Sequence, residues 1–453
     1  MNLFVTRPLF EVTTGTRRPH IPNTQDQQAR GNPPGSPVVL IVAPTDALYR
    51  GYCLESVAAA YNVVTITPEP LTWEQPYVID HEVADLYDEE AVLAAGEALA
   101  RRHSIAGVMT WNELMLVDTA RLARRLGLPA DTPDVLEGCR DKATSRARFA
   151  QHRVPSAKSM KATTLQSAAL AAESIGYPVV VKPSGEAGSI GVIRVNGAEE
   201  LPAGFEFASQ GSGFWSGKRT GVLVEEYLDG PEISVECVTF QGETTPVAIT
   251  RKSLGFAPYF EETGHCVDAR DPLLPVAGPV AVAALRALGV TTGIQHVEMR
   301  LTPTGPRIVE VNGRIGGDLI GKLVLLATGI DLPRAAADIA TGIKPDLTPT
   351  RQRAAAISIL YPQTSGTVTE RHIDEAFARE TEWLEQISWI TETGDQVTLP
   401  PAGDVDVARV GLLVVTAPDA DQAAQRLRSA EDHITITVQP DTHGHASLRA
   451  VAA

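Results

Sequence analysis

Two glutamates on neighbouring strand-like segments have the type and spacing to hold a divalent cation. The segments GIQHVEMRL and PRIVEVN are separated by TPTG, a turn signal, which predicts a β-hairpin. If residues 302–306 form the loop, Leu301 pairs with Arg307 and Glu298 lies directly opposite Glu310. Facing carboxylates repel each other, and burial would raise the pKa of one of them unless a cation lies between them.

Asn312 adds a third oxygen to this pair. It follows Glu310 by two residues, which places it on the same face of the strand. Carboxylate and amide oxygens suit Mg²⁺, whose shell is usually completed by water and substrate phosphates. His296 and Arg300 share the face of Glu298 and could meet anions there. The alternative is a solvent-exposed hairpin face with ordinary charges, and the pairing alone leaves both interpretations open.

A lysine followed by a loop of small residues could bind phosphate. In VVVKPSGEAGSIGV a strand ends at Lys182, and the glycines and serines that follow allow backbone N–H groups to point into one cavity. The lysine precedes the glycines, so the segment matches neither the P-loop nor the dinucleotide-binding fingerprint. The alternative is a flexible hairpin tip, which the glycine loop alone favours.

Two further segments carry acids beside glycine and proline. In VLVEEYLDGPEISVE the alternation breaks at Glu225 and Glu226, and Glu232 could accept hydrogen bonds from two ribose hydroxyls. In isolation this segment is more simply explained as a hairpin with surface acids. In FAPYFEETGHCVDARDP, Glu262 and His265 lie in a segment that is either a functional loop or an ordinary exposed one.

Composition limits the partners. The chain has 453 residues, enough for about three domains, and its hydrophobic share of 43% supports real cores. A net charge of −16 argues against nucleic acid and against anionic membranes as partners, while a local basic pocket for a small anion is compatible with it. Small-molecule partners are therefore expected.

Signals for export or membrane insertion are not evident in the sequence. The four cysteines form no C-x-x-C pair, which argues against structural zinc and a disulfide framework. The start, MNLFVTRPLF, lacks the apolar stretch and cleavage site of a signal peptide. No apolar run reaches the roughly 18 residues of a membrane span. We expect a cytoplasmic protein.

The predicted secondary structure that positions these residues changes in type along the chain. Residues 1–36 are expected to be a disordered leader, because most of them belong to a polar stretch rich in Pro, Gly, Gln and Asn. Alternating strand and helix patterns then predict a small doubly wound α/β domain at 37–135. An α+β unit with antiparallel hairpins follows, and a further module begins after residue 345.

The order of the motifs resembles the ATP-grasp superfamily. A lysine in RDKATSR comes first, then the strand, lysine and glycine loop, then EEYLDGPEISVE, then E…E-x-N-x-R. The segments EETGHCVDARDP and EVNGRIGGD are most similar to bacterial L-amino-acid ligases, which make dipeptides. The resemblance implies an α/β and α+β fold with a pre-ATP-grasp domain at 37–135, a lid region at 136–230, a metal-bearing catalytic region at 231–345 and a C-terminal subdomain at 346–453.

The resemblance also implies which residues bind the nucleotide and the metal. ATP would be bound by Lys142, Lys182, Ser189, Glu225, Glu226, Leu228, Glu232 and His296. Magnesium would be held by Glu298, Glu310 and Asn312. Two ions would bridge the phosphates, and Mn²⁺ could substitute for Mg²⁺.

The substrate and catalytic residues follow from the same resemblance. The amino-acid site would include Glu262, His265, Arg314, Gly316 and Gly317, and the catalytic residues would be Arg314, Lys182, Glu262 and His265. Arg314 would face the acyl phosphate, and Asp318 is expected to cap the helix that follows it.

The implied activity is that of an ATP-dependent carboxylate–amine ligase. It would join two amino acids through an acyl phosphate to give an α- or γ-glutamyl-linked dipeptide, ADP and phosphate. The resemblance places this reaction in specialised metabolism and in a homodimer. The alternatives are a carboxylase or purine-biosynthesis-type ligase of the same superfamily, and a nucleotide-binding protein without catalysis. IGGD stands where the carboxylases continue with Gln-Val-Glu-His, which argues against bicarbonate as the substrate. The sequence does not select the two amino acids.

Overall fold

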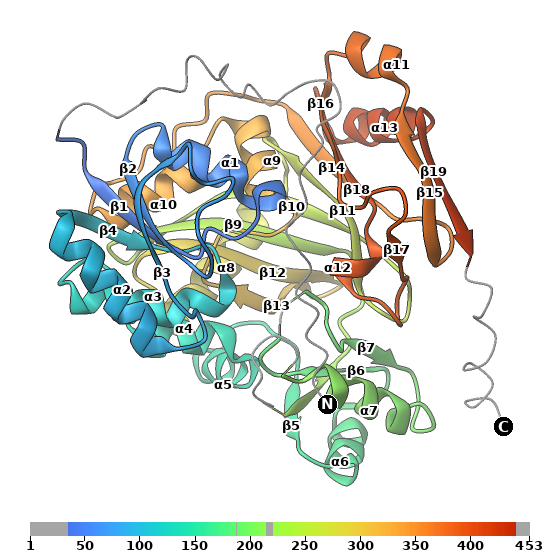
Figure 1. Ribbon diagram of the computed structural model, residues 1–453. Helices are drawn as coiled ribbons and strands as arrows, with labels where there is room; N and C mark the ends of the chain where they lie inside the picture. The colour runs from blue at the N-terminus through green and yellow to red at the C-terminus, as the bar shows by residue number, and fades with distance from the viewer. Residues whose placement is uncertain (1–34, 187, 214–220, 441–453) are drawn as a thin grey trace, which may run out of the picture.

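The computed structural model describes residues 35–186, 188–213 and 221–440. The expected leader at 1–36 therefore lies outside the described residues as far as position 34. Four sheets organise the described chain, with the N-terminal sheet, the lid sheet and the C-terminal strands arranged around a long central sheet (Figure 1). Within these ranges every helix is too short or too polar for a transmembrane segment.

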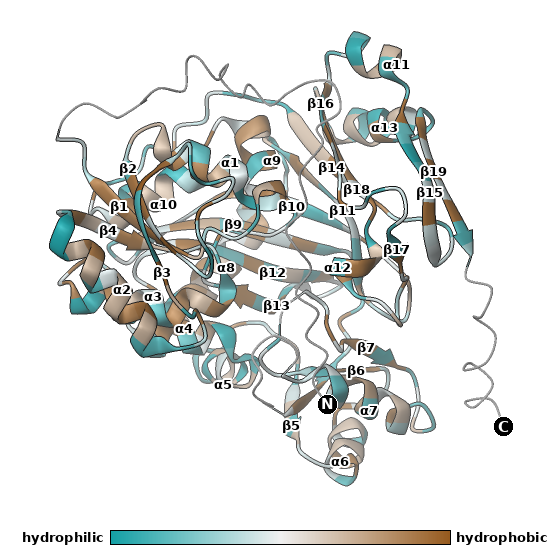
Figure 2. Cartoon of the chain, viewed as in Figure 1, coloured by the Kyte–Doolittle hydropathy of each residue, from teal (hydrophilic) through white to brown (hydrophobic). Residues whose placement is uncertain are grey.

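The first sheet is parallel and has the strand order β3-β2-β1-β4. Its region comprises β1 (Val38–Val42), α1 (Ala47–Ala58), β2 (Asn62–Thr67), β3 (Val78–Val83), α2 (Glu89–Arg102), β4 (Ile105–Met109), η1 (Glu113–Met115) and α3 (Leu116–Arg125). Alternate residues of β1 enter two different cores, one on each face of the sheet. Both faces are buried, so β1 is apolar along its length (Figure 2).

A small antiparallel sheet forms the lid, with the strand order β5-β8-β6-β7. Two helices, α4 (Pro133–Arg140) and α5 (Lys142–His152), lead into it. The lid comprises β5 (Ser159–Ala162), α6 (Leu165–Ile175), β6 (Val179–Pro183), β7 (Ile193–Val195), α7 (Leu201–Gly211) and β8 (Val222–Glu226). Its helices and strands share one separate hydrophobic core, so the lid is a compact unit beside the central sheet (Figure 1).

The central sheet has eight strands in the order β13-β12-β9-β10-β11-β14-β18-β16. Its first part comprises β9 (Glu232–Phe240), β10 (Glu243–Gly255), β11 (Glu261–Asp268), α8 (Leu274–Leu288), β12 (Gly293–Thr302), β13 (Gly305–Asn312), α9 (Ile320–Thr328) and α10 (Leu332–Ala340). Helix α8 covers one face, while α9 and α10 cover part of the other. On β9, Val235 and Cys237 pack under α8, and strand alternation therefore turns Glu236 to the other face.

The C-terminal strands continue the central sheet. The region comprises β14 (Ala354–Leu360), β15 (Gly366–Ile373), α11 (Glu375–Glu380), β16 (Leu384–Trp389), β17 (Gln396–Val397), α12 (Val405–Ala408), β18 (Gly411–Ala417), α13 (Ala420–Glu431) and β19 (Ile434–Pro440). β14 pairs with β11, while β15, β17 and β19 form a small sheet of their own. The region expected as a subdomain at 346–453, described as far as residue 440, thus shares its main sheet with residues 231–345, because β11 offers an edge that β14 completes.

The hairpin of β12 and β13 corrects one predicted pairing and confirms another. Leu301 pairs with Pro306, not with Arg307, because the turn is shorter than expected. A β-bulge between positions 298 and 299 of β12 inserts one extra residue on β13 and restores the register, so Glu298 still faces Glu310. The predicted opposition of the two glutamates is therefore confirmed.

Gly230, in the turn before β9, has a backbone that requires glycine. Its φ is +142°, and a Cβ at this position would lie 2.0 Å from the carbonyl oxygen of Leu301. Its own carbonyl accepts a hydrogen bond of 3.0 Å from Arg300. The turn therefore holds β9 close to β12, at the end of the sheet that carries Glu232 and Arg300.

We expect Gly230→Ala to destabilise the protein by about 3 kcal/mol, since the added Cβ meets backbone and the conformation is strained for alanine. Gly242→Ala is the matched control: φ is +82° there, but a Cβ would meet nothing within 4 Å, so a cost of about 1–2 kcal/mol is expected. Midpoints of thermal unfolding compare the two variants. Equal decreases would contradict the close approach at Gly230.

Candidate active site

One cavity collects most of the predicted site residues. It is lined by Lys142, Lys182, Ser189, Glu225, Glu226, Leu228, Glu232, Glu262, His296, Glu298, Glu310, Asn312, Arg314 and Gly317. The lid, the central sheet, α5 and the C-terminal segment around α12 all contribute to its walls. His265 and Gly316 do not line it; both lie directly behind residues that do.

The opposed glutamates each have a lysine partner. Lys142 Nζ lies 2.8 Å from Glu310, and Lys252 Nζ lies 3.0 Å from Glu298. Asn312 is buried at the end of β13 and lines the same cavity. Two carboxylates that face each other, with an amide oxygen beside them, are a donor set that fits a hard divalent cation such as Mg²⁺.

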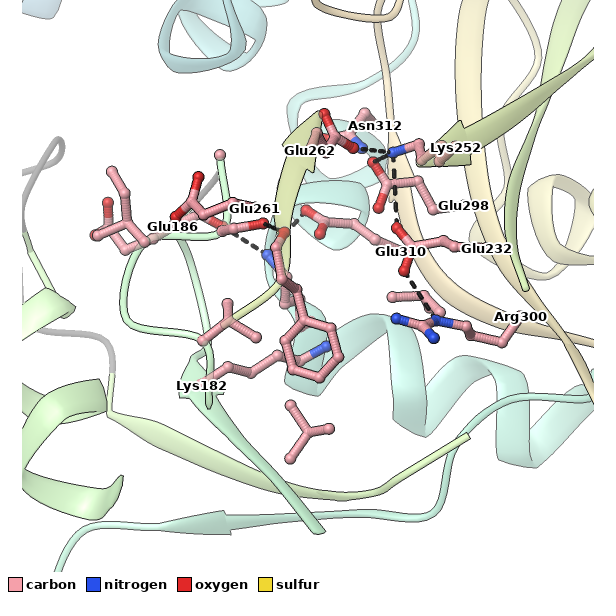
Figure 3. Close-up of a pocket in the computed structure, with 18 of the residues that line it drawn as sticks. Lys182, Glu186, Glu232, Lys252, Glu261, Glu262, Glu298, Arg300, Glu310 and Asn312 are labelled. Atoms are coloured by element: carbon pink, nitrogen blue, oxygen red, sulfur yellow. Dashed lines mark hydrogen bonds and ion pairs between the residues drawn. The ribbon is translucent and has the colours of Figure 1, made fainter. Parts of the chain in front are cut away.

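Lys252 is a site residue that sequence reasoning missed. Its side chain is only 1% exposed, and its Nζ lies 2.6 Å from Glu262 and 3.9 Å from Glu232 in addition to its contact with Glu298. Figure 3 shows it pointing between Glu262 and Glu298. Burial lowers its pKa, but the three carboxylates outweigh burial and raise the pKa well above the usual range. The only sequence signal was a charged residue inside the strand PVAITRKS.

His296 positions Glu298. Its Nδ1 lies 2.9 Å from both oxygens of Glu236, and its Nε2 lies 3.1 Å from Glu298. Burial lowers the pKa of His296, yet the neighbouring Glu236 carboxylate raises it overall to about 9. Both ring nitrogens are thus engaged by carboxylates. His296 also lines the cavity, so its predicted contact with the nucleotide stays a prediction beside this positioning role.

On the lid side, Glu225 is bound by two cations. Lys182 Nζ lies 2.6 Å from its carboxylate, and Arg146 lies 2.8 Å from it. Burial raises the pKa of Glu225, but the two cations outweigh burial and lower it to about 2. Glu226 forms a bidentate pair with Arg307, at 2.8 Å for each contact. Arg146 and Arg307 were not predicted as site residues.

The glycine-rich loop reaches across the cavity. Ser189 has a φ of +58°, and its hydroxyl donates a 2.8 Å hydrogen bond to the carbonyl of Phe260, next to β11. Lys142 donates a 2.6 Å hydrogen bond to the carbonyl of Glu186 from the opposite side. At the base of the cavity, Glu232 is paired with Arg300 at 2.9 Å. The loop therefore connects the lid to the central sheet.

Arg314 is held by a residue from the N-terminal region. Its Nε lies 2.8 Å from Glu113, which follows β4, and its Nη1 donates a 3.0 Å hydrogen bond to the Ile315 carbonyl. The carbonyl of Gly316 accepts a 3.0 Å hydrogen bond from Arg50. Two residues far away in sequence thus fix the position of the arginine and the glycine turn, and neither Glu113 nor Arg50 was predicted.

Asp318 does not cap the helix that follows it, which corrects the prediction. Helix α9 begins after Leu319, which has a φ of +60° and makes no side-chain capping bond. The Asp318 carboxylate instead forms two contacts with Arg409, at 2.7 and 3.1 Å, and lies 3.3 Å from His265. Burial raises the pKa of Asp318, but Arg409 outweighs burial and holds it well below the usual range.

Glu262, His265 and Asp318 form a second compact group. Their ligand atoms all lie within 4.8 Å of one another. Lys252 already neutralises Glu262, and Arg409 already neutralises Asp318. Two carboxylates and an imidazole at this spacing can hold a metal ion, or accept hydrogen bonds from the polar groups of a small substrate.

Comparison with known proteins agrees with this geometry. Residues 175–322 match the ATP-grasp domain, and residues 62–130 match the ATP-grasp N-terminal domain. The chain therefore contains an ATP-grasp domain and an ATP-grasp N-terminal domain. The fold class expected from the sequence, α/β and α+β with an ATP-grasp arrangement, is confirmed.

Several named ligases are similar to the chain. Carnosine synthase 1 of Homo sapiens is 30% identical over 286 residues, 59% of this chain, although these span only 34% of that protein. Alanine–anticapsin ligase of Bacillus amyloliquefaciens is 25% identical over 66% of this chain and 74% of its own. The L-amino acid ligase structure from Bacillus licheniformis superimposes with a TM-score of 0.76 at 23% identity, covering 89% of this chain and 99% of that one.

A purine-type ligase is similar as well. Phosphoribosylamine–glycine ligase of Streptomyces coelicolor is 28% identical over 378 residues, which cover 77% of this chain and 85% of that protein. As an ATP-grasp protein, the chain is an ATP-dependent ligase that forms a carbon–nitrogen bond. ATP-grasp enzymes in general use ATP and Mg²⁺.

We expect Lys252→Ala to lower the stability of the metal-free protein by about 3 kcal/mol, because three partly buried carboxylates lose a shared cation whose own side chain is buried. Lys161→Ala removes the same charge from an exposed position and should change stability by less than about 0.5 kcal/mol. Midpoints of thermal unfolding give the comparison. Added Mg²⁺ should recover part of the loss in the Lys252 variant. An unchanged midpoint would contradict this role for Lys252.

Proposed function

We propose that the chain joins two amino acids into an α- or γ-glutamyl-linked dipeptide. The carboxylate of the first amino acid attacks the γ-phosphate of ATP, which releases ADP and gives an acyl phosphate. The amine of the second amino acid then attacks the acyl carbon and releases phosphate. One observation supports the proposal: a single cavity is lined by three lysines, by Arg314, and by the carboxylates Glu262 and Asp318. The lysines can bind phosphates, and the carboxylates can bind the amino group of a substrate.

Three buried lysines would neutralise the phosphates of ATP. Lys142, Lys182 and Lys252 line the cavity, and each has a carboxylate partner within 3.0 Å. Phosphoryl transfer depends chiefly on positioning and on charge neutralisation. Lysines already held by carboxylates are pre-oriented for this task and lose little side-chain entropy when ATP binds.

Glu298, Glu310 and Asn312 would hold magnesium. The ion would neutralise charge on the phosphates and orient them. His296 and Glu236 fix the orientation of Glu298, as an outer shell of hydrogen bonds does around metal ligands in general. Two bound ions, and Mn²⁺ as a substitute for Mg²⁺, belong to the proposal.

Arg314 would stabilise negative charge on the reacting acyl group. Glu113 holds the guanidinium through Nε, which leaves other N–H donors directed elsewhere. A fixed fork of donors suits the oxyanion that forms when an amine attacks an acyl phosphate. Glu113 acts as a positioning residue in this scheme because its contact is with Arg314.

The amino-acid site would lie between Glu262 and Asp318. Glu262 lines the cavity and can accept a hydrogen bond from a substrate ammonium group. Gly317 lines the cavity beside Asp318, and the absence of a side chain there allows close approach of the substrate. His265 is buried behind both acids and would orient them without touching the substrate.

A purine-biosynthesis-type ligase is the main alternative, because a relative of that type is similar to the chain. A sugar phosphate needs cationic side chains that are available to its phosphate group. Arg314 and Arg409, the arginines next to the proposed amino-acid site, are instead paired with Glu113 and Asp318. A phosphorylated substrate would have to share these arginines with their acids, as ATP would share the paired lysines, so the product mass in the experiment below separates the two types of ligase.

We expect the protein to release phosphate from ATP only when a suitable amino acid is present, and to form an acyl hydroxamate when hydroxylamine replaces the second amino acid. A matrix of amino-acid pairs, read by phosphate release and product mass, identifies the substrates. Phosphate release without a hydroxamate for any amino acid would contradict the acyl-phosphate route. Incorporation of labelled bicarbonate would indicate a carboxylase instead.

We expect Glu310→Gln to lower kcat by about 10²-fold or more and to raise the Mg²⁺ concentration needed for half-maximal activity, because a charged ligand is lost. Glu243→Gln, at an exposed position of β10, is the matched control and should behave as the wild type. Titration of ATP turnover with Mg²⁺ checks both variants. An unchanged magnesium dependence in Glu310→Gln would show that the metal assignment is wrong.

A further inference from the structure

Glu261, the first residue of β11, is a cavity residue that the mechanism above does not use. It lines the cavity and is only 7% exposed. Its Oε2 atom is buried and has no hydrogen-bond partner within the described residues. An unpaired buried carboxylate oxygen is costly, so its presence in a ligand cavity points to a partner that arrives with the substrate.

Glu261 differs from the ion-paired acids that line the same cavity. Those with a lysine, arginine or histidine within 4.0 Å are Glu225, Glu226, Glu232, Glu262, Glu298, Glu310 and Asp318. Within the described part of the chain, Glu261 forms no such ion pair. It is therefore the acid in this group that a cationic substrate can engage without displacing a lysine or an arginine.

The charges around Glu261 are mostly negative. Glu262, Asp318 and Asp404 all repel a negative charge on it, and Arg409 is the cation that favours one. Arg409 is already bound to Asp318 by two contacts. Burial first, and these acids second, raise the pKa of Glu261 to about 7 despite Arg409.

Tyr361 is a further ionisable group near Glu261. Its hydroxyl donates a 3.0 Å hydrogen bond to the carbonyl of Glu262 and accepts one of 3.2 Å from Arg409. Burial, the largest influence, raises the pKa of this phenol, so it stays neutral at neutral pH. It therefore fixes the backbone beside Glu261 and the C-terminal arginine without adding charge.

We propose that Glu261 is the general base of the ligation step: it binds the ammonium group of the acceptor amino acid and accepts a proton from it. The proposal rests on the ligase function proposed above. An acceptor amino acid enters as an ammonium ion, which has no lone pair and cannot attack an acyl carbon. A carboxylate without a cation of its own supplies both the attraction for the ammonium and the acceptor for its proton.

The ligation step makes and breaks bonds around the acceptor nitrogen. One N–H bond of the ammonium breaks and its proton forms an O–H bond with the Glu261 carboxylate. The freed nitrogen lone pair forms the C–N bond, and the C–O bond to the phosphate breaks with its electron pair on phosphate. The departing phosphate takes the second proton from the nitrogen and leaves as hydrogen phosphate, which gives the neutral amide, and Glu261 returns its proton to solvent after product release.

The neighbouring acid and histidine are less suited to this task. One oxygen of Glu262 is held at 2.6 Å by Lys252, so Glu262 can orient a substrate ammonium group but already shares its charge with a lysine. His265 does not line the cavity, and its Nε2 faces Asp318 and Glu262. Glu261 combines an unpaired oxygen with a place in the cavity wall. Asp318, four residues after Arg314, is close enough to Glu261 to influence its charge.

The test compares two acceptors in the full-length protein carrying Glu261→Gln. Hydroxylamine is largely uncharged at neutral pH and needs no base, so hydroxamate formation should stay within about twofold of wild type. Dipeptide formation with the amino-acid acceptor should fall by about 10²–10⁴-fold at neutral pH. Glu261→Asp, which keeps the carboxylate, should recover part of the lost rate.

The pH profile separates proton transfer from a structural role. Wild-type dipeptide formation should fall as pH drops below about 7, where Glu261 becomes protonated. In Glu261→Gln the rate should rise about tenfold per pH unit up to the pKa of the free amine, because only acceptor that is already deprotonated reacts.

Equal losses with hydroxylamine and with the amino acid would overturn the general-base proposal, and so would a Glu261→Gln variant that keeps the wild-type rate and pH profile. Failure of the wild type to form any hydroxamate is a different result: it would remove the ligase function itself. The hydroxylamine reaction also shows that the variant is folded and binds ATP.

Discussion

The mutual repulsion of Glu298 and Glu310 organises the site. Two carboxylates that face each other on adjacent strands are unfavourable, and the surrounding fold supplies a cation to each. Lys142 comes from the start of α5, Lys252 from β10, and protonated His296 from β12 itself. Helix α5 and strands β10 and β12 therefore meet at the cavity with the positive charges that compensate the two glutamates of the β12–β13 hairpin.

The two faces of the central sheet differ in polarity, which allows one face to form the core and the other to line the cavity. The face under α8 is apolar along β9 and β12, while the opposite face is apolar only where α9 and α10 cover it. Beyond those helices β9 and β12 present acids and His296 to the cavity, and β10 presents Lys252. This alternation could be predicted from the sequence, because period-two patterning and turn signals are local. The extent of the sheet could not, since β14 joins β11 across a long gap in the chain.

The parts of the site that could be predicted depend on local sequence patterns, and the missed parts depend on contacts between distant segments. Glu298 and Glu310 could be predicted as a pair although the turn was misjudged, because a bulge restored the register. Lys252 carries no motif, and its role depends on acids from three other positions in the sheet. Asp318 was misassigned as a helix cap because its true partner, Arg409, lies 91 residues further along the chain. Partners at such separations leave no periodic signal in a single sequence.

The contact between Arg409 and Asp318 has a consequence for how this fold can be recombined. The C-terminal segment supplies both a wall of the cavity and the counter-charge of an acid in it, while β14 and β18 complete the sheet beneath. A chimera that grafted the lid and hairpin onto another C-terminal region would leave Asp318 buried without its cation. Exchange of substrate preference between relatives therefore has to include the C-terminal region from residue 346 onward, about the last quarter of the chain, as one inherited unit.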